Sequence, residues 1–233
     1  MQRILLVKTS SLGDVVHNLP VVSDIARHVP DAVVDWLVEE PFAALPALHP
    51  RVNRVITVAV RRWRKALLSR ATREEFAAYR QAVGAERYDA VIDTQGLVKS
   101  ALLARAAGLA PGGVRHGYDA ASAREPFAAR FYSRHHVVSR DLHAVPRNRQ
   151  LAAAALGYEI RSGVDGDAVE YGIQAPAGVQ AAHTHPAPYA VFLHGTSRAD
   201  KCWAEERWIA LGNALADGGI DAVLPQGLSL IHI

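Results

Sequence analysis

The sequence predicts an α/β protein in which parallel sheets are covered by helices on both faces. Short apolar runs with strand character alternate with segments of helical period along most of the 233 residues, and this alternation is typical of parallel sheets. Residues 161–187 interrupt the rhythm with Gly, Pro and polar residues, and a second strand–helix–strand series follows. We therefore expect two successive α/β domains, with the boundary inside the interruption.

The first domain is expected to contain four clear strands and two weaker ones. Each clear strand is a short apolar run bounded by polar or turn residues. The clear strands are predicted at 4–7, 33–38, 52–58 and 90–93, and the weaker ones at 114–117 and 136–138. Helices are predicted from residue 14 onward and at 42–48, 74–83, 98–107 and 147–156. Pro20 lies inside the first of these, so we expect a kink or an early break there.

The second domain is expected to begin with a strand at 189–194, a helix at 204–216 and a strand at 220–224. We place the first domain at 1–165, the linker at 166–187 and the second domain at 188–233. A single strand–helix–strand unit cannot bury both faces of its own sheet, so we expect most of the second domain to be missing from this sequence. Leu228–Ile233 resembles translated sequencing adapter, and we expect the native sequence to run to about Gly227. The alternative is a natural short C-terminal strand.

The composition excludes several classes of protein. Half of the residues are hydrophobic and 21% are charged, which is typical of a globular chain and not of a disordered one. No apolar run approaches the ~18–20 residues of a membrane span, and the few apolar residues before Lys8 are too short a run for a signal peptide. A single cysteine, Cys202, excludes an internal disulfide, so we expect a cytoplasmic protein. The 11 histidines show no metal-ligand spacing, and no metal site is expected.

A polar loop follows the first predicted strand. It reads KTSSLGD from Lys8 to Asp14, and ligands of open α/β sheets bind beyond the carboxyl ends of the strands. The glycine spacing is that of neither a P-loop nor a dinucleotide-binding loop. Asp14 has two interpretations: it caps the helix that begins here, or it is a general base at the mouth of the sheet.

Four cations in five residues follow the third predicted strand, in the sequence RRWRK at Arg61–Lys65. Of the 26 basic residues in the chain, 22 are arginine, whose planar guanidinium binds phosphate and carboxylate in a bidentate manner. The cluster is either a solvated basic face or a site for a multiply anionic ligand, an acidic membrane surface or nucleic acid. Arg124 and His143 are further polar residues near strand ends, and neither is specific alone.

The loop after the first strand of the second domain carries Thr196, Ser197 and Lys201. Hydroxyls and a lysine at the carboxyl end of a strand can hold a phosphate. The alternative is a plain connection to the helix that follows. Cys202, beside Trp203, is expected to be a packed thiol, because the spacing gives it no histidine partner.

Together these stretches resemble the lipopolysaccharide heptosyltransferase I family, whose members are glycosyltransferases of the GT-B type with two Rossmann-like domains. The matching motifs occur in the family's order and cover nearly the whole chain up to Gly227. They are KTSSLGDVVHNLP at 8–20, DWLVEEPF at 35–42, VAVRRWRKA at 58–66, YDAVIDTQGLVKSA at 88–101, AREPFA at 123–128 and FLHGTSRADKCWAEERW at 192–208. The KTSSLGD opening resembles the type I enzymes more than type II.

The resemblance implies an inverting transfer of L-glycero-D-manno-heptose from ADP-heptose to the first Kdo sugar of Kdo2-lipid A, without metal or cofactor. Carried over by motif, Asp14 would be the general base. Thr196, Ser197 and Lys201 would contact the donor diphosphate and stabilise the departing ADP. The acceptor would contact Lys8, Ser10, Ser11, Gly13, Arg61, Arg62, Arg64, Lys65, Gln95, Arg124 and His143. A lipid acceptor implies peripheral contact with the cytoplasmic face of the inner membrane.

The sequence departs from the family pattern in two respects. Ala204 replaces the usual proline, and most of the donor domain is missing, so we expect this fragment to bind the acceptor without transferring a sugar. Two alternatives stay open: the same fold acting on another heptose acceptor, as in type II enzymes, and a non-catalytic module that binds anions or nucleic acid through Arg61–Lys65. No helix-turn-helix, zinc or RNP signature supports a nucleic-acid partner.

Overall fold

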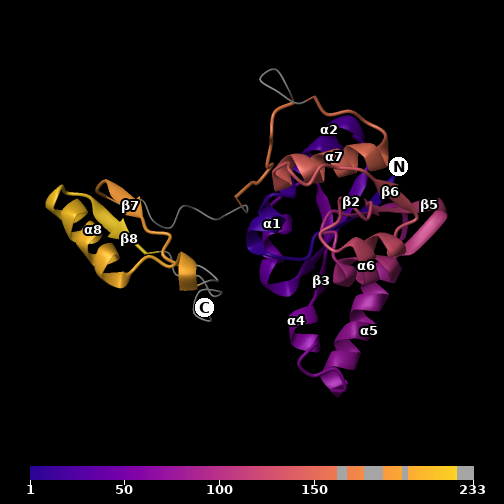
Figure 1. The fold of residues 1–233 in the computed structure, drawn as a ribbon, viewed down its shortest axis with the longest axis horizontal. Coiled ribbons are helices and arrows are strands. Elements are labelled where there is room, and N and C mark those ends of the chain that lie inside the picture. Colours follow the sequence, from indigo (N-terminus) through magenta and orange to yellow (C-terminus); the bar gives the residue numbers. More distant parts are fainter. Residues whose placement is uncertain (162–166, 176–185, 196–198, 225–233) are drawn as a thin grey trace. The chain divides into compact units, whose positions relative to one another are not determined.

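The computed structural model describes residues 1–161, 167–175, 186–195 and 199–224. The chain divides into two compact units, Met1–Pro176 and Ala177–Ile233, and the colours of Figure 1 follow the sequence through both. The first unit contains a six-stranded sheet and the second a two-stranded sheet. The mixed α/β architecture with parallel sheets is the one predicted from the sequence.

The sheet of the first unit is parallel throughout, with the strand order β3-β2-β1-β4-β5-β6. Its strands are β1 Arg3–Val7, β2 Val33–Glu39, β3 Val52–Val58, β4 Arg87–Asp93, β5 Gly108–Tyr118 and β6 Arg134–His136. β5 begins earlier than the predicted Val114, inside a segment with the composition of a turn. The segment is glycine-rich because β5 runs close to β4: a Cβ at Gly113 would collide with the carbonyl oxygen of Tyr88.

Helices connect the strands in the order expected for a doubly wound sheet. They are α1 Leu12–Val16, α2 Leu19–His28, η1 Glu40–Phe42, α3 Ala44–Ala47, α4 Val60–Trp63, α5 Arg70–Gly84, α6 Val98–Arg105, η2 Pro126–Phe131 and α7 Ala144–Leu156. The predicted helix from Asp14 is therefore two helices. Pro20 lies in the first turn of α2, where its missing N–H costs no intrahelical hydrogen bond. The four-residue α4 has too few residues to show a period and was not predicted.

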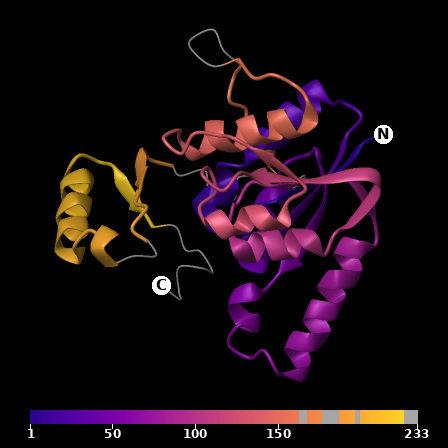
Figure 2. The same ribbon diagram turned by 45° about the vertical axis from the view of Figure 1, so that its right-hand side comes forward.

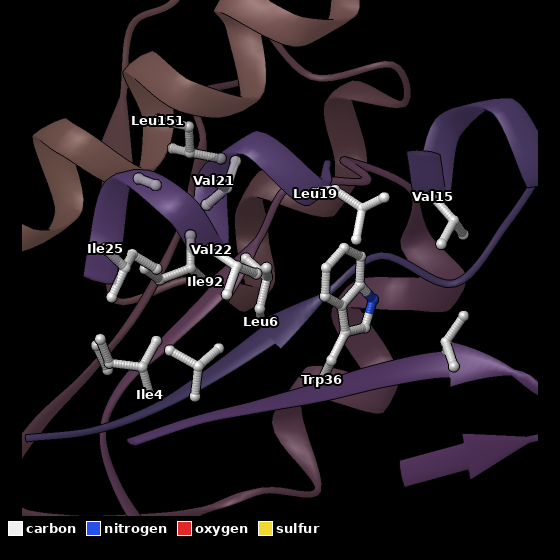
Figure 3. Packing of buried hydrophobic residues seen from close by; sticks show 14 of the residues in the cluster. Ile4, Leu6, Val15, Leu19, Val21, Val22, Ile25, Trp36, Ile92 and Leu151 are labelled. Carbon is white, nitrogen blue, oxygen red and sulfur yellow. The ribbon is translucent and has the colours of Figure 1, made fainter. Parts of the chain in front are cut away.

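Alternating side chains of the central strand serve two separate cores. Ile4 and Leu6 of β1 belong to the core on one face of the sheet, and Leu5 and Val7 belong to the core on the other. This is the two-residue alternation of a strand that is covered on both sides. Figure 3 shows the first core, in which side chains of α2 and Leu151 of α7 face the strands. The loop that leaves β1 therefore starts from a buried strand.

The segment from α4 to α5, residues 60–84, forms a projection that we call the α4–α5 hairpin. Figures 1 and 2 show that it extends away from the sheet, with its connecting loop at the far end. Trp63 of α4 and Tyr79 of α5 anchor it to the second core, where both are buried. Leu67 and Leu68 in the connecting loop are exposed.

The second unit is small. Strands β7 Tyr189–Val191 and β8 Asp221–Val223 pair in parallel, and α8 Glu205–Asp217 follows the short η3 helix Ala199–Lys201. The rings of Phe192 and Trp208 pack 4.9 Å apart between their centroids. None of the residues of α8 is buried, so this unit has little core of its own.

Candidate functional site

The strand order reverses between β1 and β4, and a cavity lies beyond the carboxyl ends of these two strands. Connections leave adjacent strands in opposite directions at such a switch point, which opens a crevice for ligands. The cavity has a volume of about 160 Å³. It is lined by Lys8, Asp14, Thr94, Gln95, Tyr118, Arg124, Ala144, Arg147 and Asn148. Four residues named from the sequence, Lys8, Asp14, Gln95 and Arg124, are thus brought together.

Asp14 combines the two roles that the sequence left open. It is the third residue of α1, and its Oδ2 accepts hydrogen bonds from the backbone N–H of Ser11 at 3.1 Å and from the Ser11 hydroxyl at 3.4 Å. The same oxygen accepts from Arg124 at 3.4 Å, and the carboxyl group lines the cavity. No described residue is recorded as donating to Oδ1. One oxygen therefore holds the helix start, and the other is free to accept a proton from a ligand.

Lys8 is buried at the base of the cavity, with 3% of its surface exposed. Its Nζ donates to the carbonyl oxygen of Thr94 at 2.8 Å and to Oδ1 of Asn148 at 3.4 Å. Burial lowers the pKa of Lys8 to about 8, and the negative charges of Asp14 and Asp93 partly oppose that shift. At neutral pH the ammonium group thus places a positive charge beneath the Asp14 carboxylate.

Gln95 holds the loop after β1 in place. Its Oε1 accepts from the backbone N–H groups of Thr9 at 3.1 Å and Ser10 at 3.2 Å. The loop after β4 is itself folded around Asp93, whose carboxylate accepts from the N–H of Gln95 and from the Ser100 hydroxyl, each at 2.8 Å. Burial raises the pKa of Asp93. Gln95 therefore shapes the cavity from its wall, and its carbonyl oxygen is already engaged.

The remaining predicted residues of the first loop lie beside the cavity and do not line it. Ser10 is nearly buried, and its hydroxyl accepts from Nζ of Lys99 at 3.1 Å. Ser11 is exposed at the start of α1. A Cβ added to Gly13 would meet nothing within 4 Å, so no packing constraint in the described residues explains a glycine there.

The four cations of the basic cluster have different surroundings. Arg62 forms ion pairs with Glu40 and Glu75, so its charge is already neutralised. Arg61 lies 5.9 Å from the centre of the Phe42 ring. Arg64 and Lys65 are exposed, and no ion pair to either is recorded within the described ranges. Arg61, Arg64 and Lys65 are therefore the members of the cluster with charge available to an anionic ligand.

Comparison with known proteins shows which family the chain belongs to. Residues 76–229 match the model of glycosyltransferase family 9 (heptosyltransferase), and lipopolysaccharide heptosyltransferase 1 of Escherichia coli K12 is 50% identical over 97% of this chain and 68% of its own length. The chain belongs to glycosyltransferase family 9. The relative of the same name from Pseudomonas aeruginosa PAO1 is 48% identical over 97% of this family 9 chain and 61% of its own length. The chain thus spans about two thirds of the length of these relatives.

Solved structures confirm the fold expected for a family 9 enzyme. E. coli heptosyltransferase WaaC with ADP matches with a TM-score of 0.84 and 48% identity, over 97% of this chain and 68% of that one. WaaC with ADP-2-deoxy-2-fluoro heptose matches with a TM-score of 0.83 and 47% identity, over 97% and 69%. The structure of E. coli heptosyltransferase II, at 20% identity and a TM-score of 0.70, supports the fold alone. The resemblance to type I enzymes is confirmed, and the family favours an enzyme over a nucleic-acid-binding module.

Five of the residues that line the cavity were not identified from the sequence: Thr94, Tyr118, Ala144, Arg147 and Asn148. Arg147 and Asn148 lie in the first turns of α7, and Tyr118 ends β5. The Arg147 guanidinium lies 4.9 Å from the centre of the Tyr118 ring and donates to the carbonyl oxygen of Ser122 at 2.6 Å. An arginine and an asparagine at a helix start, just after the last strand of the sheet, were the signal that could have found them.

His143 is close to the cavity but does not line it. It is the residue before α7, where its Nδ1 accepts from the N–H of Val145 at 3.4 Å, and its ring meets that of His17 at 4.9 Å. The sequence predicts a role in orienting an acceptor, and the structure assigns it the start of α7.

The predicted donor-binding residues belong to the second unit. Thr196 and Ser197 lie outside the described residues, and Lys201 is exposed at the end of η3. Cys202 is exposed, so the expectation of a packed thiol is wrong: the short unit does not bury the turn that carries it.

Two further observations concern metal sites and membrane-spanning helices. Within the described part of the chain, no group of three or more His, Cys, Asp or Glu side chains is placed to hold a metal ion. Among the same residues, no helix combines the length and the apolarity that are needed to cross a bilayer.

Proposed function

We propose that the reaction of this family 9 enzyme is the transfer of L-glycero-D-manno-heptose from ADP-heptose to the first Kdo sugar of Kdo2-lipid A. The observation that carries the proposal is Asp14, a carboxylate with one free oxygen in the switch-point cavity of a chain that is 50% identical to a lipopolysaccharide heptosyltransferase 1. The solved structures of WaaC with ADP and with ADP-2-deoxy-2-fluoro heptose support ADP-heptose as the donor. In this proposal residues 1–165 bind the acceptor and residues 188–233 begin the donor-binding domain.

Asp14 acts as the general base in the proposed reaction. The acceptor hydroxyl gives its proton to Oδ1 of Asp14 while its oxygen attacks the anomeric carbon of the heptose. The bond from that carbon to the diphosphate breaks, ADP leaves with the electron pair, and the anomeric centre inverts. Positioned general bases of this kind contribute typically ~10²–10⁴ to the rate. The hydrogen bonds from Ser11 hold Oδ2, so they fix the direction in which Oδ1 points.

Cations around the base bind the acidic part of the acceptor. Lys8, Arg124 and Arg147 all line the cavity, and a sugar carboxylate entering it would meet three positive charges. Arg124 donates to Oδ2 of Asp14, so an acceptor carboxylate that takes over this guanidinium would remove a positive charge from the base and raise its basicity. Ser10, Ser11, Gly13, Gln95 and His143 complete the proposed acceptor surface, with Gln95 acting through the loop that it holds.

Phosphates of the acceptor are assigned to the basic cluster on α4. Positive charge is available for these phosphates on Arg61, Arg64 and Lys65. Arg62 is already paired with Glu40 and Glu75. The same cations would hold the enzyme peripherally on the anionic cytoplasmic face of the inner membrane, where each basic residue near the surface contributes ~1 kcal/mol. We assign no nucleic-acid partner. Thr196, Ser197 and Lys201 are the proposed contacts of the donor diphosphate, with no metal or cofactor required.

The substitution Asp14→Asn tests the proposal. Because an asparagine keeps an oxygen that accepts from the N–H of Ser11, the start of α1 is preserved while the base is lost. ADP release is measured with Kdo2-lipid A and ADP-heptose in the chain continued after Gly227 with the last third of the E. coli relative, and acceptor binding is measured in the 233-residue chain. We expect kcat to fall by about 10²–10⁴ in the continued chain, with acceptor binding within about twofold.

The matched control is Asp31→Asn, which removes an exposed carboxylate far from the cavity residues in the sequence. It is expected to leave both transfer and acceptor binding unchanged. If Asp14→Asn turns over at the parent rate, Asp14 is not the base and the assignment of the reacting centre fails.

A further inference from the structure

The loop at the tip of the α4–α5 hairpin exposes two adjacent leucines that the proposed reaction does not use. Leu67 is 66% exposed and Leu68 is 92% exposed. Figures 1 and 2 show that this loop is the end of the hairpin that lies farthest from the sheet. Single exposed apolar residues are common on protein surfaces, but two adjacent ones at the end of a projection can enter an apolar phase while the core of the unit stays intact.

Positive charge is concentrated in the same segment. Residues 61–73 contain six Arg or Lys and no Asp or Glu, in a chain whose formal net charge is only +3, so the rest of the chain is net negative. All six cations are exposed. Two of them, Arg62 and Arg70, are paired with glutamates, and no ion pair to the other four is recorded in the part of the chain that the structure describes. Clusters of four to eight basic residues of this kind are typical of sites that bind anionic lipid.

Hydrogen bonds between the two helices hold the hairpin in shape. Oε2 of Glu75 on α5 accepts from the Arg62 guanidinium at 2.8 Å and from Nε1 of Trp63 at 2.7 Å, and both donors lie on α4. The hydroxyl oxygen of Ser69 accepts from the N–H of Thr72 at 3.1 Å and so caps the start of α5. Both ends of the connecting loop are therefore fixed, and the loop presents its leucines at the tip.

The side chains of the tip favour a bilayer over nucleic acid as the partner. Cations alone would suit either of these polyanions. Proteins that bind single strands add exposed aromatic rings on which the bases stack, but the one aromatic residue of 61–73, Trp63, is buried. The exposed apolar side chains are leucines, which have no ring for stacking. A basic cluster together with an apolar insertion supplies the two signals that stable interfacial binding requires.

We propose that the tip of the α4–α5 hairpin inserts Leu67 and Leu68 into an anionic phospholipid bilayer, with Arg64, Lys65 and Arg73 at the level of the headgroups. The inference deepens the membrane contact of the proposed function and rests on that function for the presence of a bilayer. Phospholipid, and not the sugar acceptor, is the ligand of the tip. Docking in this way keeps the enzyme at the surface that contains its lipid acceptor.

The first test measures flotation of the 233-residue chain with vesicles that contain no Kdo2-lipid A. One set of vesicles mixes phosphatidylglycerol with phosphatidylcholine, and the other is phosphatidylcholine alone. We expect binding to the anionic vesicles to be at least about tenfold tighter. Equal binding to both sets would overturn the proposal. Binding that appears only when Kdo2-lipid A is added to the vesicles would also overturn it, because the tip would then be a contact of the acceptor.

A leucine variant separates insertion from adsorption by charge alone. Leu68→Gln is expected to weaken binding to the anionic vesicles by about tenfold, because one leucine side chain is no longer removed from water. The matched control is Val137→Gln, at an apolar side chain that is 84% exposed outside the hairpin, and it should bind within about twofold of the parent. Both positions are exposed, so these changes should spare the fold, and a thermal melt verifies this. Parent-like binding of Leu68→Gln would overturn insertion.

A pair of arginines on one helix tests whether the tip is the part that docks. Arg73 and Arg80 are both exposed on α5, and seven residues place them on the same face of the helix, ~10 Å apart along its axis. Arg73 is the nearer to the tip, and attraction to an anionic surface falls off within a Debye length of ~8 Å at physiological salt. Arg73→Gln should therefore weaken binding about fivefold, and Arg80→Gln less than about twofold. Equal losses would overturn docking by the tip in favour of a general attraction of the first unit.

A label at the tip reports insertion directly. Cys202 is the sole cysteine of the chain, so the combination of Cys202→Ser with Leu68→Cys carries a single environment-sensitive NBD label in the loop. On anionic vesicles its emission should shift to the blue and aqueous iodide should quench it less, while the same label on Val137→Cys should show neither change. Unchanged quenching of the vesicle-bound tip label would overturn insertion. Asp14→Asn should bind the vesicles like the parent chain, so a failed transfer mechanism and a failed docking site give different results.

Discussion

The two units of this chain share one local pattern and differ in how much of it is buried. In the first unit β1 is buried from Ile4 to Val7, and helices cover both faces of its sheet. In the second unit α8 buries no residue, and Ile209 and Leu224 are 55% and 59% exposed. A local sequence thus suffices to form a strand or a helix, but long-range neighbours decide whether that element has a core.

The same difference in burial determines which of the proposed site residues are held rigidly. Asp14, Lys8 and Gln95 stand on loops that leave the buried central strands β1 and β4, and their hydrogen bonds tie these loops together. Lys201 stands on an exposed turn of the second unit. Local stability follows burial, so the proposed acceptor site in the first unit is preorganised, and the proposed donor contact Lys201 belongs to the less stable part of the chain.

The largest effect is expected from removing one tryptophan from each unit. Trp36 is fully buried in the first core, and Trp36→Ala should lower the free energy of unfolding by about 3–5 kcal/mol. Among the described residues, the Trp208 ring packs against the rings of Phe192 and Trp203, and Trp208→Ala should change the free energy of unfolding of the first unit by less than about 0.5 kcal/mol. Urea unfolding followed by far-UV circular dichroism measures both. Similar losses in the two variants would mean that the second unit contributes to the same cooperative core.

The sequence predicts the central elements because their signal is local. The expected strand at 52–58 is β3 without any change of bounds. The start of β5 was not predicted, because Gly113 is required by its proximity to Tyr88 of the neighbouring strand, and that proximity has no local signature. α4 was not predicted because four residues cannot show a helical period.

The same distinction between local and long-range signals applies to the residues of the site. Asp14 and Lys8 were predicted because polar residues after a buried strand mark the ligand-binding edge of a sheet. Arg147 and Asn148 were missed, because only the strand order of the folded sheet brings α7 to the switch point. The cation cluster was read as uniform, yet Glu75, distant in sequence from Arg62, pairs with it across the hairpin.

An intermediate effect is expected at acid pH, where a buried histidine pair in the first unit should lower the stability of the fold. Nδ1 of His116 lies 3.0 Å from Nε2 of His136, and burial lowers the pKa of His116 to about 4. An unfolded histidine binds a proton near pH ~6.5, so the unfolded chain binds more protons between the two values. Stability from His116 is therefore present above pH ~6.5 and is lost as the pH falls toward 4, by up to about 3 kcal/mol.

His116→Gln measures this contribution. Urea unfolding between pH 7 and 4 should show a shallower loss of stability in the variant than in the parent chain. His28→Gln, at an exposed position, is the matched control and should keep the parent slope. Equal slopes for His116→Gln and the parent would show that His116 is not held neutral in the folded first unit.

The smallest effect concerns a helix cap that one unit has and the other lacks. Ser69 precedes α5 with φ −67° and ψ 148°, and its hydroxyl oxygen accepts from the N–H of Thr72 at 3.1 Å. Ala204 precedes α8 with nearly the same backbone, φ −62° and ψ 142°, and has no side-chain cap. Ala204→Ser should therefore stabilise α8 by about 0.5–1 kcal/mol, which slows hydrogen exchange in its first turns by about two- to fivefold. Ser69→Ala should cost α5 a similar amount. Unchanged exchange in Ala204→Ser would mean that α8 opens only together with its whole unit, which would make the second unit more cooperative than its burial indicates.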